Sequence, residues 1–284
     1  MRPDLRSRRG STSIGGVLAI ALARAFAGAF AGAFVCATVL PAQAPLAGGI
    51  PGGWVEANAL YQSVSNGFGD WQGAYLRAVR PSARDTWWAD VLALEAFTER
   101  GTQVGITQRH DWSPRVFQMI GASVGSGASI MPRVRADGTV GVRLGDRRQW
   151  QTSVGASYVK SVSELSDVAG IASVAWYAPH ALMLETGVRY NVSRPGNIRS
   201  HRLINSASWT PTPRRTLSAR VIAGSEGWQT LRSGTTLVSF HSQEYALAWR
   251  QLVAGPVALS LQGDFYRNPF YTRSGVTLGV ARYW

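Results

Sequence analysis

The sequence predicts an all-β protein: a transmembrane, up-and-down antiparallel β-barrel of about 14 strands that follows a cleaved signal peptide. Three observations predict this class. A basic and apolar leader opens the chain, segments of about 9–13 residues with alternating polar and apolar residues fill the remainder, and aromatic residues stand near many segment ends. After the leader, no stretch reaches the ~18 consecutive apolar residues that a membrane helix needs.

The leader has the three parts of a signal peptide. Four arginines near the N-terminus give it a basic start, the stretch Ala25 to Leu40 is apolar, and Ala42-Gln43-Ala44 has the small-x-small form of a cleavage site. An uncleaved anchor, in which Gly28 and Gly32 form a helix-pairing GxxxG motif, is the alternative. The expected organisation is a signal peptide, a short N-terminal lead and an outer-membrane β-barrel, at residues 1–44, 45–53 and 54–284.

Charge and cysteine content narrow the possible partners. Cys36 is the only cysteine and lies in the leader, so the mature chain is expected to carry no disulfide and no Cys-based metal site. Removing residues 1–44 leaves 24 cations and 15 acids, which is a net charge of +9. In an exported protein we expect this charge to face the phosphates of outer-membrane lipid, with no nucleic-acid partner.

Alternation with a period of two is clearest between Arg133 and Leu144. One face of this segment carries Arg, Asp, Thr and Gly, whereas the other carries Val, Ala, Gly and Leu. Asp137-Gly138 has the composition of a hairpin turn, yet the alternation continues through it without a break. The pattern therefore predicts one long strand here.

Fourteen segments of this kind are expected to be strands, and an even number places both termini at the periplasmic side. Three of them alternate poorly, namely 70–80, 86–98 and 115–124, so 12 strands is the alternative. A β-sandwich also alternates, but small residues and opposing charges on the polar face favour a wet barrel interior. The expected strands are residues 54–63, 70–80, 86–98, 102–110, 115–124, 130–145, 150–160, 167–178, 181–193, 200–210, 215–226, 236–250, 257–266 and 271–284.

Ten charged residues on the polar face are candidates for the lumen lining, as a ligand site or as an ion-pair network. Along the strands seven Arg and seven acids cancel, which predicts cross-strand ion pairs and little conductance. The longest outer loops, near 193–200 and 226–236, are expected to be too small for an elaborate lid. The ten candidates are Arg133, Arg135, Asp137, Arg143, Glu185, Arg189, Arg220, Glu244, Asp264 and Arg273.

The last predicted strand has the form of an assembly signal. Barrel assembly machinery reads a C-terminal strand that ends in an aromatic residue and carries apolar residues at alternate positions before it. Arg282 departs from this pattern, but it lies near the membrane interface, where a lipid-facing arginine is tolerated. The residues expected to form the signal are Val276, Leu278, Val280 and Trp284.

Catalytic, metal and cofactor sites are not expected. The cluster that comes nearest to a hydrolase site is His241-Ser242 with Glu244, near the predicted outer rim. Adjacent residues of a regular strand point to opposite faces, so His241 and Ser242 cannot both line the lumen. We therefore expect a non-enzymatic protein, and the alternative is a barrel enzyme that acts on lipid or glycan at the outer rim.

Several segments resemble YaiO-type outer-membrane barrel proteins. Asn66-Gly67-Phe68-Gly69-Asp70-Trp71 is similar to their early hairpin, Met131-Pro132-Arg133-Val134-Arg135-Ala136 to their Pro-Arg-x-Arg strand, and the segment from Gln149-Trp150 to Tyr158 to the next strand. The resemblance implies a bacterial outer-membrane barrel and no catalytic residues. It leads us to expect a narrow conduit, scaffold or accessory factor in cell-envelope or surface-polysaccharide handling. The expected partners are outer-membrane lipid, the barrel assembly machinery and polysaccharide.

Overall fold

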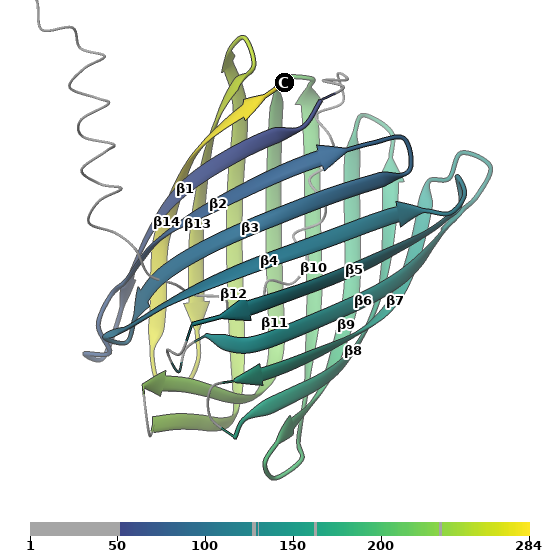
Figure 1. Ribbon diagram of the computed structural model, residues 1–284. Helices are drawn as coiled ribbons and strands as arrows, with labels where there is room; N and C mark the ends of the chain where they lie inside the picture. Colours follow the sequence, from purple (N-terminus) through teal and green to yellow (C-terminus); the bar gives the residue numbers. More distant parts are fainter. Residues whose placement is uncertain (1–51, 127–128, 130, 162–163, 233–234) are drawn as a thin grey trace, which may run out of the picture.

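The computed structural model describes residues 52–126, 129, 131–161, 164–232 and 235–284. These residues form fourteen antiparallel strands that close into a barrel, as Figure 1 shows. The predicted fold class and the higher of the two expected strand numbers are therefore confirmed. The predicted signal peptide, residues 1–44, lies outside the described residues together with Cys36 and most of the predicted N-terminal lead. In the described part of the chain, no helix is long and apolar enough to cross a membrane.

The strands follow the sequence order around the barrel, and most predicted segments agree with them to within a few residues. The largest differences are in the eleventh and twelfth strands, which extend several residues beyond the expected ends. The strands are β1 (Trp54–Val64), β2 (Trp71–Pro81), β3 (Asp85–Ala96), β4 (Glu99–Asp111), β5 (Val116–Gly125), β6 (Pro132–Leu144), β7 (Trp150–Ser161), β8 (Ser166–Ala178), β9 (Leu182–Arg194), β10 (Ile198–Thr212), β11 (Arg215–Arg232), β12 (Thr235–Ala254), β13 (Val257–Arg267) and β14 (Thr272–Tyr283).

The first and last strands close the ring. β1 pairs with β14 from Trp54 opposite Tyr283 to Val64 opposite Arg273, so neither strand leaves a free backbone edge along this length. Both ends of the barrel sequence therefore lie at one rim, which is the periplasmic rim of an outer-membrane barrel. We call the opposite end the outer end.

The alternating pattern predicts correctly which residues face outward. Val276, Leu278, Val280 and Trp284 are all exposed on the outside of β14, between 43% and 60%. Asp137-Gly138 lies inside β6 and pairs with both β5 and β7, which confirms the single long strand. The assembly role of the last strand stays a prediction.

An apolar cluster fills part of the outer half of the lumen. Trp71 and Phe97 meet edge to face with ring centres 5.0 Å apart, and Phe97 lies 5.9 Å from Tyr271. Leu92 and Leu94 enter this cluster from β3, which is why residues 86–98 alternate poorly: both faces of this stretch are apolar. We call the cluster the outer plug; it consists of Val64, Trp71, Leu92, Leu94, Ala96, Phe97, Met131, Tyr266 and Tyr271.

The β11–β12 hairpin bends over the outer end, opposite the C-terminus in Figure 1 (green, bottom). Its bend coincides with unusual backbone angles, φ of +150° at Gly224 and +51° at Ser239. Beyond the bend, Leu237 packs against the outer plug and Gln229 donates a hydrogen bond to the Tyr271 hydroxyl. We call Gly227–Gln229 and Leu237–Phe240 the hairpin tip. The segment near 226–236, expected to be a short outer loop, is thus largely the end of a long hairpin.

Candidate binding site in the barrel lumen

A cavity of about 960 Å³ occupies the lumen next to the periplasmic rim. Its mouth is lined by residues of the periplasmic turns, among them Arg147 and Arg148, and its inner end reaches Leu92 of the outer plug. Farther out, the outer plug and the hairpin tip lie across the lumen: Leu237 packs against the plug, and Gly227 lies against Ser193 of β9. The cavity therefore opens toward the periplasm and ends at the outer plug.

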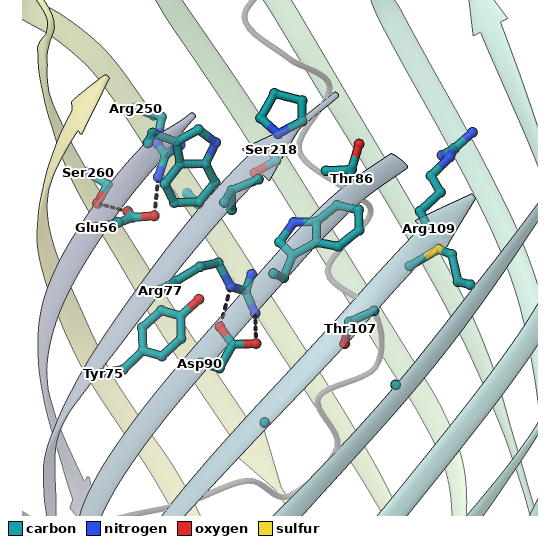
Figure 2. Close-up of a pocket in the computed structure, with 18 of the residues that line it drawn as sticks. Glu56, Tyr75, Arg77, Thr86, Asp90, Thr107, Arg109, Ser218, Arg250 and Ser260 are labelled. Atoms are coloured by element: carbon teal, nitrogen blue, oxygen red, sulfur yellow. Dashed lines mark hydrogen bonds and ion pairs between the residues drawn. The ribbon is translucent and has the colours of Figure 1, made fainter. Parts of the chain in front are cut away.

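Two ion pairs lie on one wall of this cavity, as Figure 2 shows. The Arg77 guanidinium holds the Asp90 carboxylate with two contacts, of 2.6 Å and 3.3 Å, across the β2–β3 pair. Arg250 of β12 pairs with Glu56 of β1, and the Ser260 hydroxyl donates to Glu56 at 3.0 Å. Each cation of this wall thus has its own carboxylate.

Sequence reasoning missed both pairs. Arg250 is the last residue of the expected strand 236–250, but β12 continues to Ala254, so its side chain lies inside the barrel. The signal for Glu56 was available, because it alternates with outward-facing neighbours in β1. The Arg77–Asp90 pair becomes apparent only once the register of β2 against β3 is known.

A second polar network lies deeper, on β10 to β13. Arg220 contacts Glu244 at 2.6 Å, and Arg202 lies 3.8 Å from Glu226. The Tyr266 hydroxyl donates to Glu226 at 3.0 Å, which ties this network to the outer plug. Of these residues, only Arg220 and Glu244 were among the ten candidates.

Nine of the ten predicted lumen residues are buried or half-buried. Arg135 pairs with Asp137 of its own strand at 2.7 Å, and Arg189 donates to the Ser157 hydroxyl at 3.0 Å. The exception is Arg133, which is exposed and lies at a bulge that interrupts the pairing of β6 with β7. The candidates that line the cavity are Arg135, Asp137, Arg143 and Arg220. The others within the barrel are Glu185, Arg189, Glu244, Asp264 and Arg273.

The cavity carries more positive than negative charge. Its lining contains eight arginines and four carboxylates, so the cancellation expected along the strands does not extend to the cavity surface. The excess of arginines comes from strand ends and turns at the periplasmic rim, whose side chains line the mouth of the cavity. The arginines are Arg77, Arg109, Arg135, Arg143, Arg147, Arg148, Arg220 and Arg250; the carboxylates are Glu56, Asp90, Asp111 and Asp137.

The residues of the nearest hydrolase-like cluster do not converge. Ser242 is buried and its hydroxyl donates to Glu226, whereas His241 is exposed on the opposite face of β12. Glu244 is held by Arg220. This is the opposite-face arrangement that the strand geometry predicts.

Comparison with solved structures shows a channel protein that shares this β-barrel fold, and others that are similar to a lesser degree. The monoaromatic hydrocarbon channel CymD has a TM-score of 0.55 and 6% sequence identity, over 82% of this chain and 88% of that one. The anion-selective porin from Comamonas acidovorans has a TM-score of 0.46 and 10% identity, over 82% and 96% of the two chains. No curated protein sequence matches the chain significantly.

Comparison with protein-family models identifies one family for this chain. The YaiO membrane beta barrel domain matches residues 54–228, which is more than half of the chain and begins at the first strand. This match confirms the resemblance seen in the hairpin and strand motifs. The chain belongs to the family of YaiO membrane β-barrel domains, and it is a multi-pass β-barrel of the bacterial outer membrane.

Proposed function

We propose that this protein is a non-enzymatic envelope barrel: a narrow conduit that takes up a ligand from the periplasm and is closed at its outer end by the outer plug together with the hairpin tip that packs against it. One observation carries the proposal. The cavity of about 960 Å³ opens at the periplasmic rim and ends against the outer plug. A closed outer end and an open inner end describe a conduit in its resting state.

The cavity lining favours a polar ligand that has flat, partly apolar faces. Ion pairs and amide groups such as Asn58 and Gln103 alternate with the aromatic side chains of Trp54, Tyr75 and Trp88. Aromatic faces with a few placed polar groups are the usual lining of a specific small-molecule site. Sugar rings combine apolar faces with hydroxyl rims, so the lining supports a role in surface-polysaccharide handling.

Closure depends on a few contacts of the hairpin tip. Gln229 donates to Tyr271 and accepts a bond from Asn268 at 3.5 Å, and Phe240 meets Phe270 edge to face at 5.8 Å. These contacts are far fewer than the backbone ladder that holds the rest of β11 and β12 in the wall. Displacing the hairpin tip therefore requires no break in the barrel.

Planar-bilayer recording tests this proposal. The mature barrel should conduct little, whereas a variant in which an Asn-Gly turn replaces residues 228–238 should conduct steadily, because it lacks most of the hairpin tip. Both proteins must show the same heat-modifiable migration on unheated gels, so that only folded barrels are compared. Equal, low conductance of both folded proteins would show that the hairpin tip does not close the barrel, and a large wild-type conductance would contradict a closed resting state.

A further inference from the structure

We infer that the cavity mouth contains an oxyanion site, built from four arginines of which two are held in place by their neighbours, that binds carboxylate or phosphate groups of a soluble ligand entering from the periplasm. The four are Arg109, Arg143, Arg147 and Arg148, which we call the arginine mouth; all line the cavity. The inference deepens the proposed function and rests on it for the direction of entry. Its ligand chemistry follows from the contacts below.

Two of these arginines are held rigidly by the same neighbours. Arg109 and Arg143 contact one Asp111 carboxylate oxygen at 3.2 Å and 2.9 Å. Both guanidinium groups also stand over the Phe117 ring, 4.2 Å and 5.5 Å from its centre. Arg143 donates a further bond to the Pro114 carbonyl at 2.9 Å. Two cations thus share one carboxylate, and their positions are fixed before a ligand arrives.

The other two arginines add charge at the same opening. Arg147 and Arg148 lie in the turn between β6 and β7, directly after the strand that carries Arg143. Neither forms an ion pair with any acid in the described ranges, and neither does Asp146 in the same turn. The arginine mouth therefore has an excess of positive charge even when Asp111 and Asp146 are both counted.

The excess of positive charge is confined to the mouth of the cavity. Farther in, each arginine of the lining has a carboxylate close by: Arg77 has Asp90, Arg135 has Asp137, Arg220 has Glu244 and Arg250 has Glu56. A guanidinium presents two parallel donors that match a carboxylate or phosphate group. Unmatched guanidinium groups at the mouth are therefore suited to capture an oxyanion, whereas the paired ones within the cavity are already satisfied.

Isothermal titration of the refolded mature barrel tests the site. Tri-galacturonate and inorganic phosphate serve as oxyanion probes, and the neutral trisaccharide maltotriose serves as the uncharged control. We expect both anions to bind, with an affinity that falls as salt rises, and tri-galacturonate to bind more tightly than maltotriose. Maltotriose binding as tight as tri-galacturonate would overturn the inference.

Two charge-matched double variants distinguish binding at the arginine mouth from general attraction by the net positive charge of the barrel. The double variant Arg147→Gln/Arg148→Gln should weaken tri-galacturonate binding about tenfold or more, because it removes two charge-assisted contacts. Arg84→Gln/Arg115→Gln removes the same charge from periplasmic-turn residues outside the cavity lining and should change affinity less than twofold. Equal losses in the two double variants would show bulk attraction and no site.

The result of the binding experiment does not depend on whether the barrel conducts, because the arginine mouth is accessible from the periplasm even when the outer end is closed. Anion binding that depends on Arg147 and Arg148 would support the site even if removing the hairpin tip opened no pore. Conversely, a pore that opens on removal of the hairpin tip, in a barrel that binds neither anion, would support the conduit and overturn the oxyanion site.

Discussion

Gly141 of β6 faces Phe117 of β5, and the Phe117 ring occupies the space that a β-carbon at residue 141 would need. A β-carbon built at Gly141 would lie 2.1 Å from Cζ of Phe117, which is far inside van der Waals contact. Because Arg109 and Arg143 both stand over this ring, a missing side chain on one strand positions two charges at the cavity mouth.

The first prediction is that Gly141→Ala disturbs both stability and the arginine mouth. The added methyl group displaces the Phe117 ring, and overpacking of this kind costs about 1–3 kcal/mol of unfolding free energy. The two guanidinium groups lose their common surface, so tri-galacturonate affinity should fall as well. Urea unfolding of the refolded barrel and isothermal titration measure the two effects.

Gly138→Ala is the matched control, since it lies in the same strand. A β-carbon there would meet no atom within 4 Å, so the substitution should leave both unfolding and anion affinity near the wild-type values. If Gly141→Ala unfolded at the same urea concentration as Gly138→Ala, the close approach of Phe117 would be wrong.

A second prediction concerns the ion pair that joins β1 to β12 across β13 and β14. Arg250 and Glu56 each retain only 8% side-chain exposure, and Arg250 also donates to the Tyr283 hydroxyl at 3.1 Å. Arg250→Gln leaves a buried carboxylate without its cation and should cost about 3–5 kcal/mol. Urea unfolding by tryptophan fluorescence gives the change.

The double variant Glu56→Gln/Arg250→Gln should recover part of this loss, because it removes the unpaired charge. The exposed pair of Arg100 with Glu95, in which the arginine side chain is 72% exposed, supplies the comparison. Arg100→Gln should cost about 0–1 kcal/mol. Similar costs for Arg250→Gln and Arg100→Gln would contradict the burial of the Glu56 pair.

The third prediction uses the contact between the hairpin tip and β9. A β-carbon at Gly227 would lie 2.8 Å from the Ser193 β-carbon, so a small shift brings cysteines at both positions to disulfide distance. We expect the wild-type barrel to open briefly at high voltage; in the variant Gly227→Cys/Ser193→Cys, oxidation should suppress such openings and a reducing agent should restore them. Mass spectrometry confirms the disulfide, and Ser193→Cys alone should not respond to oxidation. Undiminished openings in a disulfide-linked barrel would rule out movement of the hairpin tip.

The sequence predicts the wall of this barrel better than its interior. Alternation through Asp137-Gly138 identifies β6 correctly, because an inward and an outward face impose the same period along every strand. The same rule fails for Leu92 and Leu94, which face inward yet are apolar because they pack within the outer plug. Which inward positions meet water and which meet other side chains depends on contacts between distant strands.

Strand ends and strand bends also could not be predicted from the local sequence pattern. Arg250 ends the expected strand 236–250 and Asp111 follows the expected strand 102–110, but pairing with neighbouring strands extends β12 past Arg250 and β4 as far as Asp111, and both residues line the cavity. Ser239, at the bend, has a positive φ of +51°, a conformation that a serine in the sequence does not signal. Of the arginine mouth, only Arg143 was among the ten candidates, since Arg109 lies near a strand end and Arg147 and Arg148 lie in a turn.

The last prediction concerns assembly and the outer face of β14. Trp284 is 60% exposed at the periplasmic rim, in line with the outward-facing Leu278, and its backbone N–H donates to the Gly53 carbonyl at 3.1 Å across the closing seam. We expect deletion of Trp284 to reduce severely the heat-modifiable fraction in isolated outer membranes. Arg282 is also exposed outward, between Val55 and Val257, and a lipid-facing arginine near the interface costs only about 0–1 kcal/mol. Arg282→Tyr should therefore assemble as well as wild type or slightly better.

Tyr283→Phe supplies the control, because Tyr283 lies between these two residues but faces the lumen, where only its bond from Arg250 is lost. It should leave the heat-modifiable fraction of assembled barrel unchanged while lowering the urea midpoint slightly. Equal assembly of the Trp284 deletion and Tyr283→Phe would therefore mean that the outward face of β14 is not the signal.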